Sequence, residues 1–377
     1  MAGGPVLVME GKYASAGQYW LTKLRRAALR AILRPLLSWK SLADPEPGYS
    51  AIIGCASGLA PLLLTNLRML SRQQAPNLRK VLAVWDRPPT PQIEQVQAQA
   101  RREYGQLPLE FLHYTPTQAA VLAAVGWGWC YSWLSWSIGI AAARTRYALL
   151  HDFDAMLIRP DILEERYEAI RQRRDQYVGI RNYLGNGVYE CDGLVTTFEL
   201  IFDVSFVRER FRPIDLFNHV TIYKGRRVDF DTFLYAQSRA GRSSVLPIAV
   251  ADMVHPSQMV CQYTDYVNRR GYVPPEHNNL LMIPYFLSLS GEDETMEDLC
   301  RQLESAGQSA LKWLGRRLDV SRLTPVHARW ITEQAARLER AVFGEVRPQV
   351  VRYCSAVEKH VLQSAAAAAD GRLAEGS

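Results

Sequence analysis

The sequence predicts an α/β fold, and two observations lead to this prediction. Apolar runs of strand length alternate with helix-length stretches between residues 49 and 154, which is the pattern of parallel strands joined by crossover helices. The last of these runs, Tyr147 to Leu150, leads directly into His-Asp-Phe-Asp. Acidic side chains at the end of a strand lie at the edge where open α/β sheets bind their ligands.

The expected elements follow one another in a regular order. Strands are expected at residues 49–54, 79–85, 109–114 and 147–150, and helices at 61–72 and 92–102. Turn-forming sequences separate them, because Cys-Ala-Ser-Gly follows the first strand and Arg-Pro-Pro follows Asp86 at the end of the second.

The longest uncharged run, residues 119–143, has sufficient length to span a bilayer. Its glycine, serine and tryptophan residues reduce its hydrophobicity, and it leads directly into the strand that carries the acidic pair. We therefore expect two helices, at residues 119–125 and 133–144, with a Gly-Trp-Gly-Trp turn between them.

Asp152 and Asp154 are the first candidate site. Residues at i and i+2 of a strand share a face, so the two carboxylates are expected to point the same way. They repel each other unless a cation lies between them, and a hard divalent ion takes such oxygen ligands together with substrate phosphates. An ordinary turn is the alternative interpretation, since aspartate is frequent where strands end.

Three segments resemble the GT-A glycosyltransferases, most closely the inverting family-two-like branch. These are Ser137 to Asp154, Asp229 to Pro247, and Met253-Val254-His255-Pro256. The resemblance covers residues 49–265, a little over half of the chain. It implies a Rossmann-like mixed sheet flanked by helices, to which this chain adds helical segments at both ends.

The resemblance also implies a set of site residues. Asp154 would bind a Mn²⁺ or Mg²⁺ ion directly, Asp152 would contact the ion or the donor ribose, and His255 would complete the metal shell. Three further residues are candidates for binding the nucleotide-diphospho-sugar donor, with the first expected near the nucleobase: Asp86, Ser57 and Arg144.

The catalytic base of an inverting transfer would be Asp231 or Asp229. If a helix opens at Phe230, the two carboxylates point about 200° apart, whereas on an extended segment they share a face. Asp231 is favoured because the positive end of a following helix keeps it ionised, and Asp229 would then cap that helix. Two departures from the family pattern are this Asp-Phe-Asp in place of Glu-Asp, and His151 before the first acidic motif.

The expected function is metal-dependent transfer of a hexosyl group, with inversion, from a nucleotide-diphospho-sugar to an unidentified sugar, lipid or protein acceptor. A haloacid-dehalogenase-type phosphohydrolase is one alternative, with Asp152 as nucleophile and Asp154 as acid/base. Against it, Met156 stands where that chemistry needs Thr or Val. A catalytically inactive GT-A-like binding protein is the other alternative.

The net charge of +6 is concentrated at the two ends of the chain. Residues 18–40 combine apolar residues at helical spacing with five Lys or Arg between residues 23 and 34, so this segment predicts a basic amphipathic helix. It either lies on an anionic membrane surface or packs on the catalytic domain, and Pro35 is expected to kink it. No nucleic-acid partner is expected.

The domain organisation predicted from these features has four parts. Residues 1–45 form the basic segment, 46–290 the catalytic domain, 291–363 a helical region with helices at 292–318 and 326–363, and 364–377 a disordered tail. The six cysteines are scattered and lack the spacing of a zinc site, and no targeting signal is recognisable. These features predict a cytoplasmic protein, which the basic helix could attach to a membrane.

Overall fold

The computed structural model of the protein describes residues 11–181, 186–268, 272–305 and 310–374. Its internal contacts divide the chain into two compact units. The first comprises residues 1–60, 71–153 and 159–249, and the second residues 61–70, 154–158 and 250–377. The predicted boundaries at residues 45, 290 and 363 stay a prediction, because compactness of contacts divides the chain on a different criterion.

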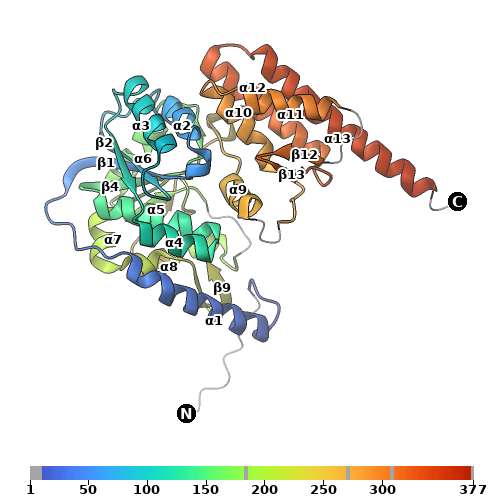
Figure 1. Cartoon of the computed structure of the whole chain (residues 1–377). Helices are drawn as coiled ribbons and strands as arrows, with labels where there is room; N and C mark the ends of the chain where they lie inside the picture. Colours follow the sequence, from blue (N-terminus) through green and yellow to red (C-terminus); the bar gives the residue numbers. More distant parts are fainter. Residues whose placement is uncertain (1–10, 182–185, 269–271, 306–309, 375–377) are drawn as a thin grey trace. The chain divides into compact units, whose positions relative to one another are not determined.

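The first unit is built on a seven-stranded sheet of order β10-β6-β7-β4-β1-β2-β3 (Figure 1). Strand β7 runs antiparallel to β4 and β6, and the other neighbours are parallel. The strands are β1 Glu46–Cys55, β2 Leu78–Trp85, β3 Leu109–His113, β4 Thr145–His151, β6 Tyr177–Gly179, β7 Leu200–Asp203 and β10 Ser243–Val245.

Helices accompany this sheet in the first unit. They are α1 Ala16–Leu33, α3 Pro91–Glu103, α4 Pro116–Val125, α5 Gly128–Ala142, α6 Ile162–Arg173, α7 Val204–Arg210 and α8 Leu234–Arg239. Short 3-10 turns are η1 Arg34–Leu36, η2 Ser57–Leu59, η3 Glu190–Asp192 and η4 Pro213–Leu216. A separate antiparallel pair joins β8 His219–Tyr223 to β9 Arg226–Phe230.

Helix α5 packs closely on the strands that carry the site. A Cβ atom at Gly139 would lie 2.3 Å from the Ile52 side chain of β1, so only glycine permits this approach. Trp133 and Trp136 of the same helix are buried in the core. None of the described helices is long and apolar enough to cross a membrane. Helix α5 begins at Gly128, within the Gly-Trp-Gly-Trp segment that was expected to form a turn.

The predicted α/β class is confirmed. All four expected strands are present, and the chain has the mixed Rossmann-like sheet flanked by helices that the resemblance to GT-A glycosyltransferases implied. The position of antiparallel β7 between β4 and β6 was not predicted from the residues, because its partners are distant in sequence.

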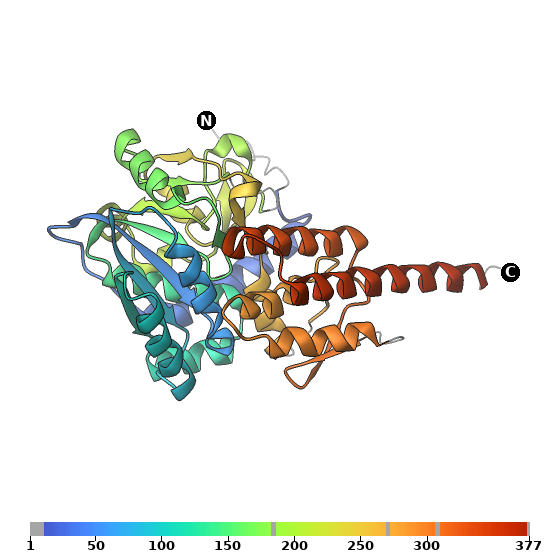
Figure 2. The same ribbon diagram turned by 90° about the horizontal axis from the view of Figure 1, so that it is seen from above.

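The second unit is mainly helical, with α2 Leu62–Leu70, α9 Met259–Asn268, α10 Met282–Leu289, α11 Glu294–Glu304, α12 Pro325–Phe343 and α13 Pro348–Ala374. Figure 2 shows α12 and α13 side by side. The helical stretch expected at residues 326–363 is interrupted at Gly344, whose φ of +82° ends α12. The 3-10 turns of this unit are η5 Val250–Asp252 and η6 Asn279–Leu281.

The helix expected at residues 292–318 is a wrong prediction in its second half. Helix α11 ends at Glu304, and an antiparallel hairpin follows, formed by β12 Ala310–Trp313 and β13 Arg316–Asp319. Leu314 and Gly315 both have positive φ, at 50° and 68°, which is the geometry of a two-residue hairpin turn. Leu311 and Trp313, two residues apart in β12, are both buried, which is the spacing of a strand and not of a helix.

Candidate metal centre

The candidate site forms where β4 ends. Asp152 follows the last residue of β4, and after a short turn the chain enters β5, Met156–Leu157. Strand β5 pairs antiparallel with β11, Met253–Val254, so that Val254 lies opposite Met156. Continued by one residue, this register places His255 opposite Ala155, the neighbour of Asp154, although His255 and Asp154 are about a hundred residues apart in the chain.

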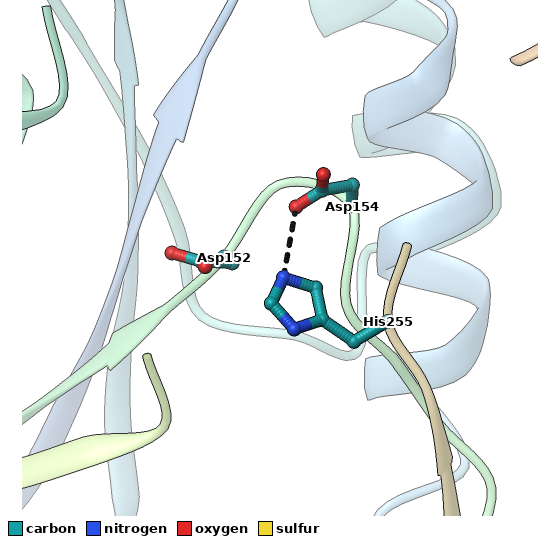
Figure 3. Close-up of side chains that lie close together, drawn as sticks. All are labelled: Asp152, Asp154 and His255. Atoms are coloured by element: carbon teal, nitrogen blue, oxygen red, sulfur yellow. Dashed lines mark ion pairs between the residues drawn. The ribbon is translucent and has the colours of Figure 1, made fainter. Parts of the chain in front are cut away.

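The three predicted metal ligands lie close together, as Figure 3 shows. His255 Nε2 lies 3.5 Å from Asp154 Oδ1, and these two side chains are 8% and 6% exposed. One ligand atom from each of Asp152, Asp154 and His255 lies within 4.8 Å of the other two. Among the described residues, this is the one such group of three potential ligands.

The donor set fits a divalent ion. Ligand atoms at about 2.1 Å from an ion lie up to about 4.2 Å apart, so the observed spacing needs only a small closure. The imidazole favours a transition-metal ion over Mg²⁺, which strongly prefers oxygen ligands. Asp154 would hold such an ion from the turn, Asp152 from the end of β4, and His255 from the end of β11.

A buried pair that the sequence did not predict lies directly before these ligands. His151 Nδ1 and Glu199 Oε1 are 2.5 Å apart, and both side chains are fully buried. Glu199 has a positive φ of 50° and precedes β7. The pair forms because Leu150 and Leu200 are opposite each other in the antiparallel ladder, and it anchors the end of the strand from which Asp152 projects.

Asn66 supports the turn from the other side. Its Nδ2 donates a hydrogen bond of 3.3 Å to the carbonyl oxygen of Ala155, and its side chain is buried in α2. The sequence offered no signal for this residue beyond its position in an amphipathic stretch.

Two of the predicted donor-binding residues lie together at the carboxyl ends of β1 and β2. The backbone N–H of Ser57 donates to Asp86 Oδ1 at 3.1 Å. Burial raises the pKa of the Asp86 carboxyl, and the Ser57 hydrogen bonds partly offset that increase. Both residues lie beyond strand ends that face the same edge of the sheet as the end of β4.

Arg144 lies elsewhere. It is exposed and precedes β4, whereas Asp152 follows it. The seven residues of β4 separate the two ends by about 23 Å. Arg144 is therefore at the opposite edge of the sheet, and we do not include it in the proposed donor site.

The two candidate bases lie on an extended segment, which was the second of the two predicted geometries. Asp229 belongs to β9, and α8 begins only at Leu234, so the expected helix at Phe230 and the expected cap at Asp229 are corrected. Asp229 is bound by Lys12 Nζ, Tyr13 Oη and Arg26 Nη1 at 3.1–3.2 Å. Asp231 Oδ1 accepts hydrogen bonds from Asn218 Nδ2 at 2.9 Å and the Thr232 N–H at 2.8 Å.

Comparisons with known proteins give a structural likeness only. No family model matches the chain, and no curated protein matches it. Among solved structures, TarS residues 1–349 from S. aureus has 12% identity and a TM-score of 0.38, covering 86% of this chain and 92% of that one. A complex of TarS 1–349 with UDP has 14% identity and a TM-score of 0.36, covering 84% and 91%.

The mannosyltransferase PcManGT from Pyrobaculum calidifontis, in complex with GDP-Man and Mn²⁺, has 15% identity and a TM-score of 0.38, covering 92% of this chain and 95% of that one. Likeness at this level assigns neither an activity nor a ligand to the present chain.

Proposed function

We propose that this protein is a metal-dependent glycosyltransferase that moves a sugar from a nucleotide-diphospho-sugar to an acceptor. The observation that carries the proposal is the convergence of Asp152, Asp154 and His255 at the carboxyl end of β4. Open α/β sheets bind nucleotides at this edge, and two carboxylates with an imidazole form a metal-binding set rather than a packing contact.

The ion held there would offset the negative charge that develops on the departing diphosphate. Asp154 is the best placed ligand, because it is buried, lies in a tight turn and already faces His255. Asp152 is less buried, so it is the ligand that can also reach a ribose hydroxyl.

The sheet edge next to the metal site would bind the nucleoside part of the donor. Asp86 and Ser57 lie beyond the adjacent strands, and burial keeps the Asp86 carboxyl a weaker acid than usual because it raises its pKa. We assign this pair to the nucleoside, and propose Asp231 as the base that accepts the acceptor's proton in an inverting transfer.

The phosphohydrolase alternative needs Asp152 as a nucleophile and Asp154 as a free acid/base. In the structure Asp154 faces the buried imidazole of His255. In this arrangement the two side chains can bind the same cation. Position 156 is a buried methionine in β5, where the phosphohydrolase pattern has Thr or Val. The geometry therefore favours the transferase.

A hydrolysis assay tests the proposal. The purified protein is incubated with UDP-, GDP- and dTDP-sugars, with Mn²⁺ or EDTA, and released nucleoside diphosphate is measured. We expect slow Mn²⁺-dependent release from one donor class, lost in Asp154→Asn. Asp298→Asn, at an exposed carboxylate on α11, is the matched control and should retain the activity.

The other outcomes separate the alternatives. Release of inorganic phosphate from phosphate monoesters, dependent on Asp152, would indicate a phosphohydrolase. Mn²⁺ binding by calorimetry without turnover of any donor would indicate a binding protein, and no Mn²⁺ binding at all would overturn the metal site itself.

A further inference from the structure

Helix α1 turns two arginines, Arg26 and Arg30, toward the protein and four large apolar side chains toward solvent. Arg26 Nη1 lies 3.2 Å from Asp229, and Arg30 Nη1 donates at 2.8 Å to the carbonyl oxygen of Phe217. On the other side, the exposed fractions are 54, 52, 67 and 54% for Trp20, Leu21, Leu24 and Ile32. These four residues, called the apolar stripe, lie within about 120° of one another around the helix.

This orientation is the reverse of an ordinary surface helix, which places its apolar face inward. The inward contacts are already provided by Tyr19 and Leu33, both buried, and by the two arginines. The apolar stripe is therefore not needed for packing on the first unit. An exposed stripe of this kind is typical of a surface that binds something apolar.

The sequence around the stripe is uniformly basic. Residues 11–43 contain seven Lys or Arg and no Asp or Glu. Arg25, Arg34 and Lys40 are exposed. The occupant of this face is therefore expected to carry negative charge together with its apolar part.

A cavity beside α1 concentrates the positive charge. Its volume is about 290 Å³, and five basic side chains line it against a single carboxylate, Asp215. His219 is on the wall, with its Nδ1 buried and without a hydrogen-bond partner. The five basic residues of this basic cavity are Lys23, Arg26, Arg30, Arg34 and Arg212.

The basic cavity and the apolar stripe adjoin each other. Ala27 and Ala31 line the cavity, and Ala31 lies only about 20° from Leu24 around the helix axis. An anion in the cavity would therefore be separated from the stripe only by alanine methyl groups. A molecule that joins a phosphate to a hydrocarbon chain matches both features at once.

We propose that α1 docks this protein on an anionic phospholipid surface, with the apolar stripe in the acyl boundary and lipid phosphate in the basic cavity. A Trp near the start of an amphipathic helix and flanking Lys and Arg residues are features of interfacial helices. A second copy of the chain fits poorly, because it would bring the same cations face to face. A free phosphate would account for the cavity but not for the stripe.

Vesicle sedimentation with the full chain tests the proposal. We expect binding to vesicles of phosphatidylcholine with phosphatidylglycerol, weakened by salt, and little binding to phosphatidylcholine alone. Leu24→Gln with Ile32→Gln should lower the partition coefficient about tenfold or more, because both side chains leave the acyl boundary. Arg34→Gln should lower it about fivefold.

Matched controls lie outside the docking face. Leu362→Gln changes an exposed leucine on α13, and Arg102→Gln changes an exposed arginine at the end of α3. Both should bind vesicles like the unchanged protein, and circular dichroism should show that all variants are folded. The assay contains neither sugar donor nor metal, so its outcome is independent of the proposed transferase activity.

Four results would overturn the proposal. The first is vesicle binding that Leu24→Gln with Ile32→Gln leaves unchanged, and the second is equal binding to neutral and anionic vesicles. The third is a dimer by light scattering that the same double variant converts to a monomer. The fourth is binding of glycerol phosphate at His219 without any binding to vesicles.

Discussion

Asp229 and Asp231 are separated by one residue, yet their surroundings give them different tasks. Asp229 is largely buried and receives two cations and a phenol from the N-terminal segment. Burial, together with the charge of Asp229, raises the pKa of the Tyr13 hydroxyl, so Tyr13 remains a hydrogen-bond donor. Asp231 is less buried and is oriented by Asn218 and by the N–H of Thr232.

The two substitutions to asparagine should therefore have opposite consequences. Asp229→Asn should lower the free energy of unfolding by about 2 kcal/mol, because hydrogen bonds to a charged group are lost, with turnover per folded molecule unchanged. Asp231→Asn should lower turnover about a hundredfold or more, with little change in stability or donor affinity. Urea unfolding and transfer kinetics on both variants measure this, and loss of transfer in Asp229→Asn alone would reverse the assignment.

The surroundings of His219 predict that the stability of the protein depends on pH. Burial, followed by the charges of Arg30 and Lys23, lowers its pKa from 6.5 to about 4, against the opposing charge of Asp215. Arg26 also lowers it, and the ring packs on Tyr235. Its stabilising contribution is complete above pH 6.5 and is lost as the pH falls toward 4, because only the unfolded chain takes up the proton readily.

We expect the unchanged protein to lose more stability than His219→Gln between pH 7 and pH 4.5, measured by urea unfolding at each pH. The other histidines contribute equally to both proteins and cancel in the difference. Phosphate groups bound in the basic cavity should raise the His219 pKa, which NMR titration of the imidazole would show. Parallel stability profiles for the two proteins would contradict the lowered pKa.

At the scale of elements, α1 is part of the first unit as well as the proposed docking face. Ser15 caps its first turn, and the helix ends at Leu33. Pro35 lies in the 3-10 turn that follows, so the helix ends at the proline where a kink was predicted. Its contacts reach β8, Asp229 and the carbonyl oxygen of Phe217. Packing on the domain and the proposed binding to a membrane are compatible, since they use opposite faces of the helix.

Deletion of residues 1–45 should therefore destabilise the protein. We expect a loss of several kcal/mol, because buried Tyr13, Tyr19 and Leu33 are removed and Asp229 is left buried without its cations. Thermal and urea unfolding of the truncated chain measure the loss. If the truncated chain proved as stable as the full one, the packing contacts of α1 would be energetically unimportant.

At the scale of the whole molecule, the proposed metal joins segments that are distant in the chain. The β5–β11 pair sets the distance between Asp154 and His255, and the His151–Glu199 pair anchors the strand end before them. An ion that binds only the folded site stabilises the whole fold by mass action.

Mn²⁺ at a hundred times its Kd should stabilise the protein by about 2.7 kcal/mol, which is an increase in Tm of several degrees. Differential scanning calorimetry measures this shift. It should be absent in Asp154→Asn and His255→Asn, smaller with Mg²⁺, and retained in Asp298→Asn. An equal shift in all four proteins would place the bound Mn²⁺ elsewhere.

The sequence by itself determined the order of strands and helices between residues 49 and 154, because hydrophobic periodicity and turn residues are local signals. It also singled out Asp152 and Asp154 as candidate metal ligands, since a strand end is visible in the chain, and a family resemblance added His255 as a third candidate. The tertiary structure alone decided which of these side chains meet. Pairing of β5 with β11 brought His255 to Asp154, pairing of β4 with β7 introduced Glu199, and the length of β4 placed Arg144 at the other edge. The tertiary structure also decided the orientation of α1. Helical spacing shows that the helix has an apolar and a basic face, but only the contacts with Asp229 and Phe217 determine which face turns inward.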